Sequence, residues 1–99
     1  MDKEMLVIVG RKWFDKTYGN TYFTAMAYFR GKSYDIPYQY GYSDQYKYET
    51  MLELEKQGVL PTPIERYKNG GTEAPWQYCE RNNIKLFTND VYVARKKDL

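Results

Sequence analysis

The sequence predicts an α+β fold: an antiparallel sheet of four to five strands with one or two helices packed on one face. Several stretches have the apolar and aromatic pattern of strands, the segment over residues 44–57 has the end signals of a helix, and that helix carries an apolar stripe. A small, partly open barrel is the alternative, but the stripe needs an apolar surface to cover. Because 99 residues bury only roughly 60–68% of their unfolded surface, we expect a single domain over residues 1–99.

The first part of the chain predicts three strands joined by tight turns. Residues 5–14 are mostly apolar, β-branched or aromatic. Gly19-Asn20 supplies the positive φ that a tight turn needs before a second strand over residues 21–30. A Gly-Lys pair then leads into a third strand over residues 33–40.

The third strand is expected at an edge of the sheet. Pro37 cannot donate a hydrogen bond to a neighbouring strand. Strict alternation places Tyr34, Ile36, Tyr38 and Tyr40 together on one face. An exposed edge makes a homodimer possible without requiring one.

Two helices are expected after these strands. The first runs over residues 44–57 and ends at Gly58, which suits the position after a helix end. Residues 61–71 hold two prolines and a Gly-Gly pair, which is typical of a surface loop. A shorter helix over residues 75–82 begins at a proline.

The end of the chain predicts a hairpin. Residues 84–87 and 91–94 read as two short strands, and Asn89-Asp90 lies between them as a turn signal. We therefore expect these two segments to pair antiparallel.

The composition excludes several kinds of chemistry. The chain has no histidine, which removes the Ser-His and Cys-His dyads and the commonest general base near neutral pH. Cys79 is the only cysteine, so this chain alone cannot build a cysteine-rich zinc site, and we expect the thiol to be a small buried group. The aspartate spacing matches no metal loop. We expect no metal, no cofactor and no enzymatic activity.

Charge and hydropathy give no sign of a membrane segment or of strong attraction to nucleic acid. The net charge is +2, with 15 Lys and Arg against 13 Asp and Glu, so the overall field is weak. No stretch approaches the roughly 20 apolar residues of a membrane helix. A cytoplasmic protein is therefore expected.

Two tyrosine-rich connections form the candidate binding surface. The stretch "KTYGNTYF" joins the first two strands, and "YQYGYSDQY" leads from the third strand into the helix. Binding residues concentrate at such connections. The predicted contacts to a partner or ligand are Trp13, Asp15, Lys16, Tyr18, Asn20, Tyr22, Tyr40, Tyr42, Asp44 and Tyr46, with Arg11 and Lys12 as basic contacts.

The high tyrosine content also has two explanations. Twelve of the 99 residues are tyrosine, and a phenol ring combines apolar area, a hydroxyl and a low entropy cost of ordering, which interfaces favour. The other explanation is a half-buried strand position with the hydroxyl in water. The tyrosines assigned to this second class are Tyr28, Tyr34, Tyr48, Tyr78 and Tyr92.

The same two stretches resemble a known group of proteins. "KTYGNTYF", followed by "IPYQYGYSDQY", a helix and "GVLP", is similar to small, largely uncharacterised bacteriophage proteins with a Gly-Asn-Thr-Tyr segment and then a Tyr-Gly-Tyr-Gly-Asp-like segment. The resemblance covers residues 1 to about 60. Phe23 stands where many of these proteins have histidine, and Ser43 where glycine is usual, so any role of that histidine is absent here. The resemblance implies a phage origin.

Two hypotheses for function follow. The first is a small phage-type protein that inhibits a component of bacterial antiviral defence by stoichiometric binding, in the cytoplasm of an infected host. The alternative is a protein that binds a nucleotide signal or single-stranded nucleic acid, with bases stacked on tyrosines and phosphates met by Arg11, Lys12 or Lys16. The partner is then a host protein or a nucleotide ligand.

Overall fold

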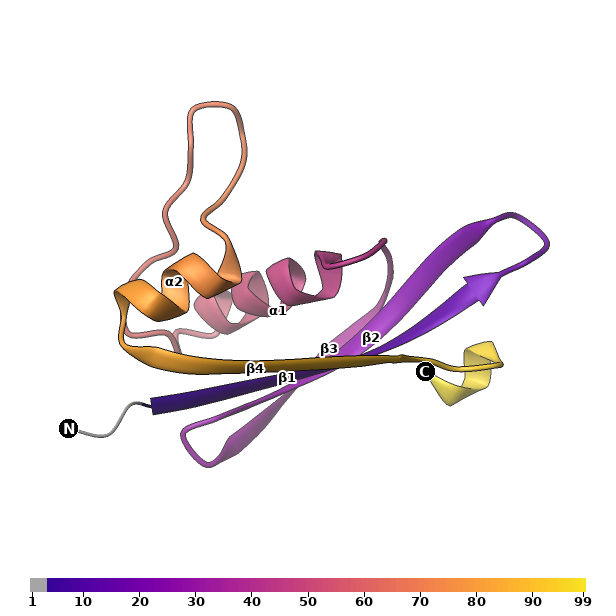
Figure 1. Cartoon of the computed structure of the whole chain (residues 1–99), viewed down its shortest axis with the longest axis horizontal. Helices are drawn as coiled ribbons and strands as arrows, with labels where there is room; N and C mark the ends of the chain where they lie inside the picture. The colour runs from indigo at the N-terminus through magenta and orange to yellow at the C-terminus, as the bar shows by residue number, and fades with distance from the viewer. Residues whose placement is uncertain (1–3) are drawn as a thin grey trace.

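A computed structural model describes residues 4–99 and shows a four-stranded sheet with two helices on one face (Figure 1). Residues 1–3 of the predicted domain lie outside the described part. The predicted α+β class is confirmed. The elements are β1 (Glu4–Asp15), β2 (Asn20–Phe29), β3 (Lys32–Tyr40), α1 (Gln45–Lys56), α2 (Pro75–Arg81), β4 (Ile84–Tyr92) and a 3₁₀ helix (Lys96–Asp98).

The sheet is mixed, and the predicted antiparallel sheet and terminal hairpin are wrong. The strand order is β3-β2-β1-β4, with β1–β2 and β2–β3 antiparallel but β4 parallel to β1. Residues 84–92 form one continuous strand in which Asn89 and Asp90 pair with Val9 and Gly10. The connection through α1 and α2 covers one face and returns the chain in the direction of β1, so long-range pairing overrides the local turn signal.

The edge position of β3 is confirmed, but the prediction that its four apolar and aromatic residues share a face is wrong. Ala25 pairs with Ile36, whereas Phe23 pairs with Gln39, so β3 contains one more residue than β2 between these pairs. Such a bulge changes which face the following residues occupy. Ile36 is therefore buried in the core, and Tyr38 lies on the opposite face of the sheet.

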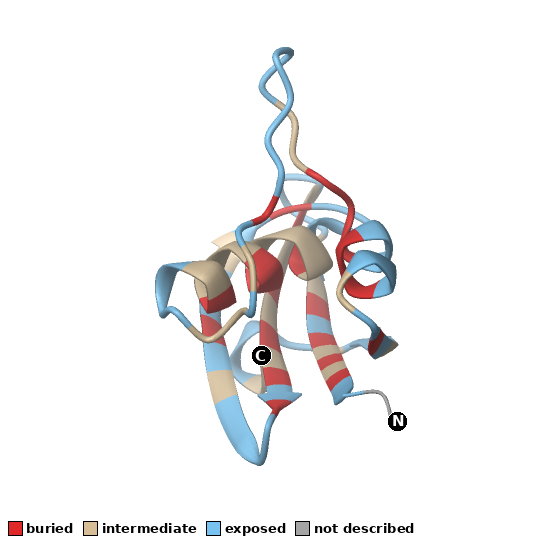
Figure 2. Ribbon diagram, turned by 90° about the vertical axis from the view of Figure 1, so that its left-hand side faces the viewer, coloured by how far each residue is buried: buried red, intermediate tan, exposed pale blue. Residues whose placement is uncertain are grey.

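One face of the sheet and the two helices enclose the core. Buried and less buried residues alternate along β1 and β2, as Figure 2 shows by colour. Burying alternate side chains against a helix layer is the main favourable term available to a sheet of this size. The core consists of Leu6, Ile8, Phe23, Ala25, Ala27, Phe29, Ile36, Tyr46, Met51, Leu54, Ile64, Tyr78, Cys79 and Ile84.

Cys79 lies in this core, as predicted, with 1% of its surface exposed. Burial raises the pKa of its thiol to about 11, with a smaller contribution from the Glu73 carboxylate. The protonated thiol is therefore the dominant form near neutral pH, and it packs as a small apolar group.

The segment between α1 and β4 is held by two carboxylate–guanidinium pairs. Residues 61–71 form the predicted loop, which extends away from both layers in Figure 1. Glu55 pairs with Arg66, and the buried Glu73 pairs with Arg81 at 2.7 Å. Hydrogen bonding to Arg81 keeps the pKa of Glu73 below its usual range. These pairs attach the middle of the loop to α1 and the residues just after it to α2.

A single tyrosine ring joins α1 to the sheet. The Tyr46 ring, 1% exposed, lies so close to Gly10 that a Cβ there would stand 2.7 Å from the ring carbon Cδ2. The Tyr46 hydroxyl donates a hydrogen bond of 3.3 Å to Asp90, and the Nζ atom of the buried Lys12 lies 3.1 Å from the same carboxylate. The Lys12 ammonium also lies 5.2 Å from the Tyr46 ring centroid. Helix α1, β1 and β4 thus meet at one polar and aromatic cluster.

We predict that Gly10→Ala destabilises the protein by about 1–3 kcal/mol, because the added methyl group overlaps the Tyr46 ring. Urea unfolding measures the change. In a Tyr46→Ala background the ring is gone, so the same Gly10 substitution is expected to have a much smaller effect. An equal cost in both backgrounds would show that the ring is not what excludes a side chain at position 10.

The Tyr46 hydroxyl also predicts a loss of stability at high pH. Burial, and secondly the Asp90 charge, raise the pKa of Tyr46 to about 12 from the usual 10.0. Between these values the unfolded chain loses this proton while the folded chain retains it, so the free energy of unfolding falls as pH rises from 10 to 12. Urea titrations across that range should show a shallower decline for Tyr46→Phe than for the wild type. Parallel declines in the two proteins would contradict this assignment.

Candidate binding surface

Four aromatic side chains gather on the face of the sheet that the helices leave open, towards the turn between β1 and β2, and Tyr42, just after the end of β3, contacts the last of them. Trp13 pairs in register with Tyr22, and Tyr22 with Tyr40, and directly opposite residues share a face. Tyr22 belongs to the open face because its neighbours Thr21 and Phe23 are buried on the other one. The group, called the aromatic row below, consists of Trp13, Tyr22, Tyr38, Tyr40 and Tyr42.

The rings of the aromatic row contact one another in sequence. Tyr22 stacks between Trp13, at a centroid distance of 5.9 Å, and Tyr38, at 5.1 Å and an interplanar angle of 11°. Tyr40 meets Tyr22 edge-on at 5.7 Å and Tyr42 edge-on at 5.2 Å. Both arrangements are favourable for aromatic quadrupoles. The row is therefore an ordered surface rather than a set of independent side chains.

Much of the row remains accessible to a partner. The exposed fractions are 42% for Tyr38, 49% for Tyr40 and 46% for Tyr42. The pKa of Tyr40 is raised, mainly by interaction with the Tyr42 hydroxyl, and the pKa of Tyr38 is raised by partial desolvation and then by Tyr22 and Asp15. These two hydroxyls are therefore protonated at neutral pH and available as hydrogen-bond donors.

The two tyrosine-rich connections form one surface. The Tyr42 hydroxyl lies 3.5 Å from the Gly19 carbonyl oxygen, and the Gly41 N–H donates to the Thr21 carbonyl oxygen at 3.0 Å. A Cβ on Gly41 would stand 2.6 Å from the Phe23 ring, so glycine permits this close return of the chain. The end of β3 is thereby attached to the β1–β2 turn.

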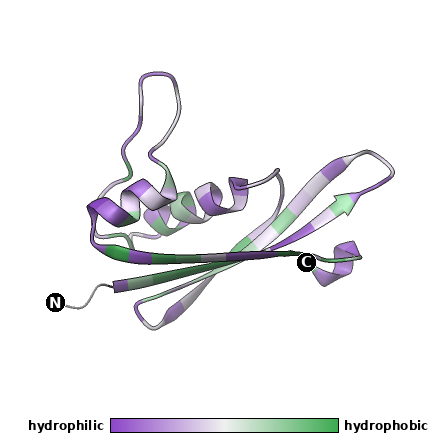
Figure 3. Cartoon of the chain, in the orientation of Figure 1, coloured by the Kyte–Doolittle hydropathy of each residue, from purple (hydrophilic) through white to green (hydrophobic). Residues whose placement is uncertain are grey.

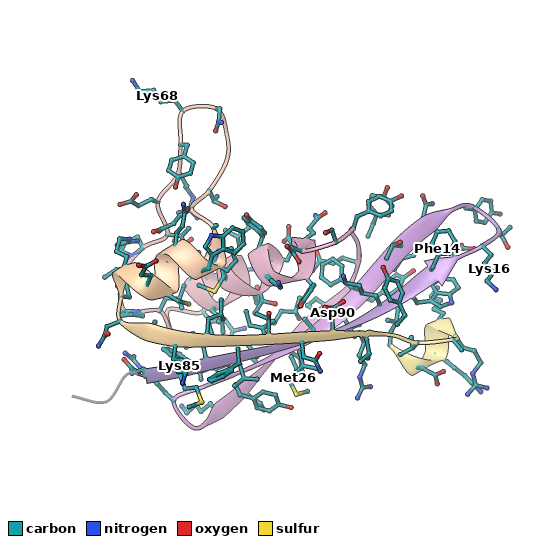
Figure 4. All side chains as sticks on the ribbon, viewed as in Figure 1. Phe14, Lys16, Met26, Lys68, Lys85 and Asp90 are labelled. Atoms are coloured by element: carbon teal, nitrogen blue, oxygen red, sulfur yellow. The ribbon has the colours of Figure 1, made fainter. Side chains whose placement is uncertain are left out.

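Four other predicted contacts lie in or near the β1–β2 turn. Tyr18 is 77% exposed, Lys16 is exposed, and Asn20 is half-buried. Figure 4 shows Lys16 at this far end of the hairpin. Asp15 accepts a hydrogen bond of 2.9 Å from the Thr17 N–H, so its carboxylate has a local role in shaping the turn.

Asp44 has a local role as well. It precedes α1, and its carboxylate pairs with Lys47, one turn into the helix, at 3.2 Å. Its side chain makes no hydrogen bond that caps the helix. Asp44 therefore lies beside the aromatic row without being part of it.

Two predicted contacts are wrong, because their side chains are in the interior. Tyr46 is 1% exposed beneath α1, where the helix turns it towards Gly10. Lys12 is 6% exposed and pairs with Asp90, so it cannot serve as a basic contact on the surface. The sequence does contain a sign that Lys12 is buried: it lies an even number of residues from the buried Leu6 and Ile8, so its side chain is on the same face of β1.

The predicted contacts left out two residues of the open face, Tyr38, which begins the second tyrosine-rich stretch, and Lys96. Tyr38 stacks on Tyr22 because the bulge in β3 brings it there, and the Lys96 Nζ atom lies 5.1 Å from the Tyr38 ring centroid. No local signal connects Lys96 with β3, because the contact forms only when the 3₁₀ helix returns across the sheet. Arg11, a predicted basic contact, is exposed on the same face, since it alternates with the buried Lys12.

Among residues 4–99, no three His, Cys, Asp or Glu side chains are grouped so that they could hold a metal ion. None of the helices described in that range is long and apolar enough to cross a membrane. No protein family, curated protein or solved structure matches this chain.

The position of Tyr22 in the centre of the row predicts an effect on stability. Tyr22→Leu retains apolar bulk but removes three ring contacts, and it should lower the free energy of unfolding by about 1–2 kcal/mol. The control is Tyr18→Leu, at an exposed position, for which we expect a change within about 0.5 kcal/mol. Urea denaturation of both variants gives the comparison. Equal effects would mean that the stacked rings do not stabilise one another.

Proposed function

We propose that this chain is a small phage-type binding protein that inhibits a component of bacterial antiviral defence by stoichiometric binding. The aromatic row is the contact surface, and the site of action is the cytoplasm of the infected host. The observation that carries the binding role is a continuous set of aromatic side chains held on the open face of the sheet. This mode of action requires occupation of a partner's surface and no catalytic group.

The composition of the row favours a protein partner. Tyrosine and tryptophan are enriched in protein interfaces because they supply large contact areas and hydrogen-bonding tips at a low entropy cost. Here the rings also hold one another in place, so less side-chain freedom is lost when a partner binds. Tyr40 and Tyr42 present ring edges and hydroxyl groups that suit a polar and apolar protein surface.

Nucleotide binding is the second candidate, and it is supported by Arg11 and Lys96 on the same face as the rings. Base stacking needs an accessible ring face. Tyr22 has Trp13 on one side and Tyr38 on the other, and Lys96 lies over the Tyr38 ring. The rings most central to the row are therefore poorly placed for stacking, which is why we favour a protein partner.

The phage and defence parts of the proposal depend on the resemblance of the two tyrosine-rich stretches to phage proteins. The residues of both stretches contribute to one surface, since Tyr42 reaches the Gly19 carbonyl. The segments that carry the resemblance are thus also those that build the row. This agreement links the origin of the chain to the surface proposed for its action.

We predict that the double substitution Tyr40→Ser/Tyr42→Ser abolishes capture of a host defence protein from lysate and protection of phage in a defended strain. Both side chains are exposed, so the fold should persist, which circular dichroism checks. Tyr67→Ser is the matched control: Tyr67 is 47% exposed, close to the 49% of Tyr40, but lies on the distant 61–71 loop.

Three outcomes would contradict this proposal. The wild type could recover no defence protein and give no protection, or the double variant could retain full activity. Alternatively, the melting temperature could rise with a nucleotide or oligonucleotide, in a manner that weakens with salt and requires Arg11. That result would favour the nucleotide hypothesis instead.

A further inference from the structure

The open face of the sheet contains a second surface, next to the aromatic row and different in character. Its side chains are mainly aliphatic and extend from the end of the sheet where β1 begins as far as Val91, which pairs with Arg11. The exposed fractions are 54% for Met5, 45% for Tyr28, 43% for Phe87 and 47% for Val91. The surface, called the apolar half below, consists of Met5, Val7, Val9, Met26, Tyr28, Phe87 and Val91.

The pattern of β1 is that of a strand covered on both faces. A sheet with one solvated face normally alternates apolar and polar residues. In β1 the buried Leu6 and Ile8 alternate with Met5, Val7 and Val9, which are also apolar. Figure 3 shows hydrophobic colouring over the first part of β1 and over part of β4, and Figure 4 shows Met26 on the side of the sheet away from the helices. Within residues 4–99 the apolar half has no helix layer over it, and only Leu99, beside Val9 and Met26, covers part of it.

Two opposite charges flank this surface. Arg11 on β1, Asp35 on the edge strand β3 and the C-terminal Leu99 line the same hollow of about 360 Å³. Neither Arg11 nor Asp35 has an ion-pair partner among residues 4–99. Arg11 pairs in register with Thr24, and Asp35 with Met26. The midpoint between the two charges thus lies over β2, between Thr24 and Met26.

We propose that the apolar half binds a second copy of this chain, face to face, about a two-fold axis that passes over β2 between Thr24 and Met26. Rotation about this axis exchanges the positions of Arg11 and Asp35, so Arg11 of each copy faces Asp35 of the other. A two-fold interface requires such a self-complementary surface. The charges then pair twice, close to the axis and beside the apolar residues.

The size of the face agrees with a small interface, because two crossed sheets overlap over only part of it. Four strands at about 4.8 Å spacing and nine residues at about 3.3 Å give an outline of about 19 by 30 Å, of which two crossed sheets share about 19 by 19 Å. Protruding side chains raise the accessible area above that of the flat outline, but the contact stays below the roughly 800 Å² per partner of a standard interface, so we expect a dimer that dissociates on dilution. A second hollow of about 510 Å³, lined by Met5, Val7 and Tyr28 among others, supplies relief that a facing copy can fill.

The geometry leaves the aromatic row accessible. Arg11 and Asp35 are separated by two strand spacings, about 10 Å, and by two residues along the strands, about 7 Å. The axis is therefore oblique to the strands, and the two sheets cross rather than align. The β1–β2 hairpin end, with Trp13 and Tyr22, then extends beyond the partner's sheet.

The test is a charge exchange followed by sedimentation velocity over a concentration series. The wild type should show a dimer of twice 11.9 kDa. Asp35→Arg and Arg11→Asp should each weaken dimerisation by at least about tenfold, because like charges then face each other. The double variant Arg11→Asp/Asp35→Arg should restore it. Glu80→Arg and Lys68→Asp, on the helix layer and the distant loop, are controls expected to change nothing.

Two results would overturn the inference. One is a wild-type protein that stays monomeric at every concentration. Binding of this monomer to neutral lipid vesicles would then show that the face contacts lipid instead of a second copy. The other is a dimer that neither single charge reversal weakens, which would place the contact elsewhere, such as the β3 edge. The inference does not depend on the proposed function. A dimer that protects no phage would support the dimer and contradict the proposed function, and a monomer that protects phage would do the reverse.

Discussion

The contact between the Tyr46 ring and the backbone at Gly10 is the constraint on which the rest of the structure depends. Because no Cβ intervenes, the first turn of α1 lies directly on β1, and the ring's hydroxyl reaches Asp90 on β4. The ion pair with the partly exposed Asp90 satisfies the charge of Lys12, which would otherwise be costly to bury. The start of α1 is thereby fixed, and with it the short connection through Gly41 and Tyr42 that returns to the β1–β2 turn.

Local signals predicted those parts of the fold that local physics determines. The first three strands and both helices were correct to within one or two residues, since alternation, turn glycines and a proline at the first helical position act over short distances. Residues 84–92 could not be predicted in this way. Asn89-Asp90 is a good turn signal, but nine residues of parallel pairing with β1 and the ion pair to Lys12 outweigh it. That competition involves residues about 80 positions apart.

The candidate surface likewise contains some residues that local signals identify and others that depend on long-range contacts. Trp13, Tyr22, Tyr40 and Tyr42 could be identified because they flank connections, where side chains are available for contact. Tyr46 has the same sequence context, yet the first turn of α1 directs it into the core. Tyr38 depends on one extra residue in β3, which reverses the face predicted by strict alternation. A bulge is visible only once the partner strand and its register are known, so a sequence read one strand at a time cannot place it.

The two faces of this sheet divide the roles of burial and recognition. The covered face contains small and large apolar residues from β1 and β2, and the helices complete it. The open face is built from the alternate residues of the same strands, so its geometry is set by the register that forms the core. Side chains positioned on paired strands are held more accurately than those on loops. The aromatic row is therefore ordered as a consequence of folding, and its rings need little further ordering to contact a partner.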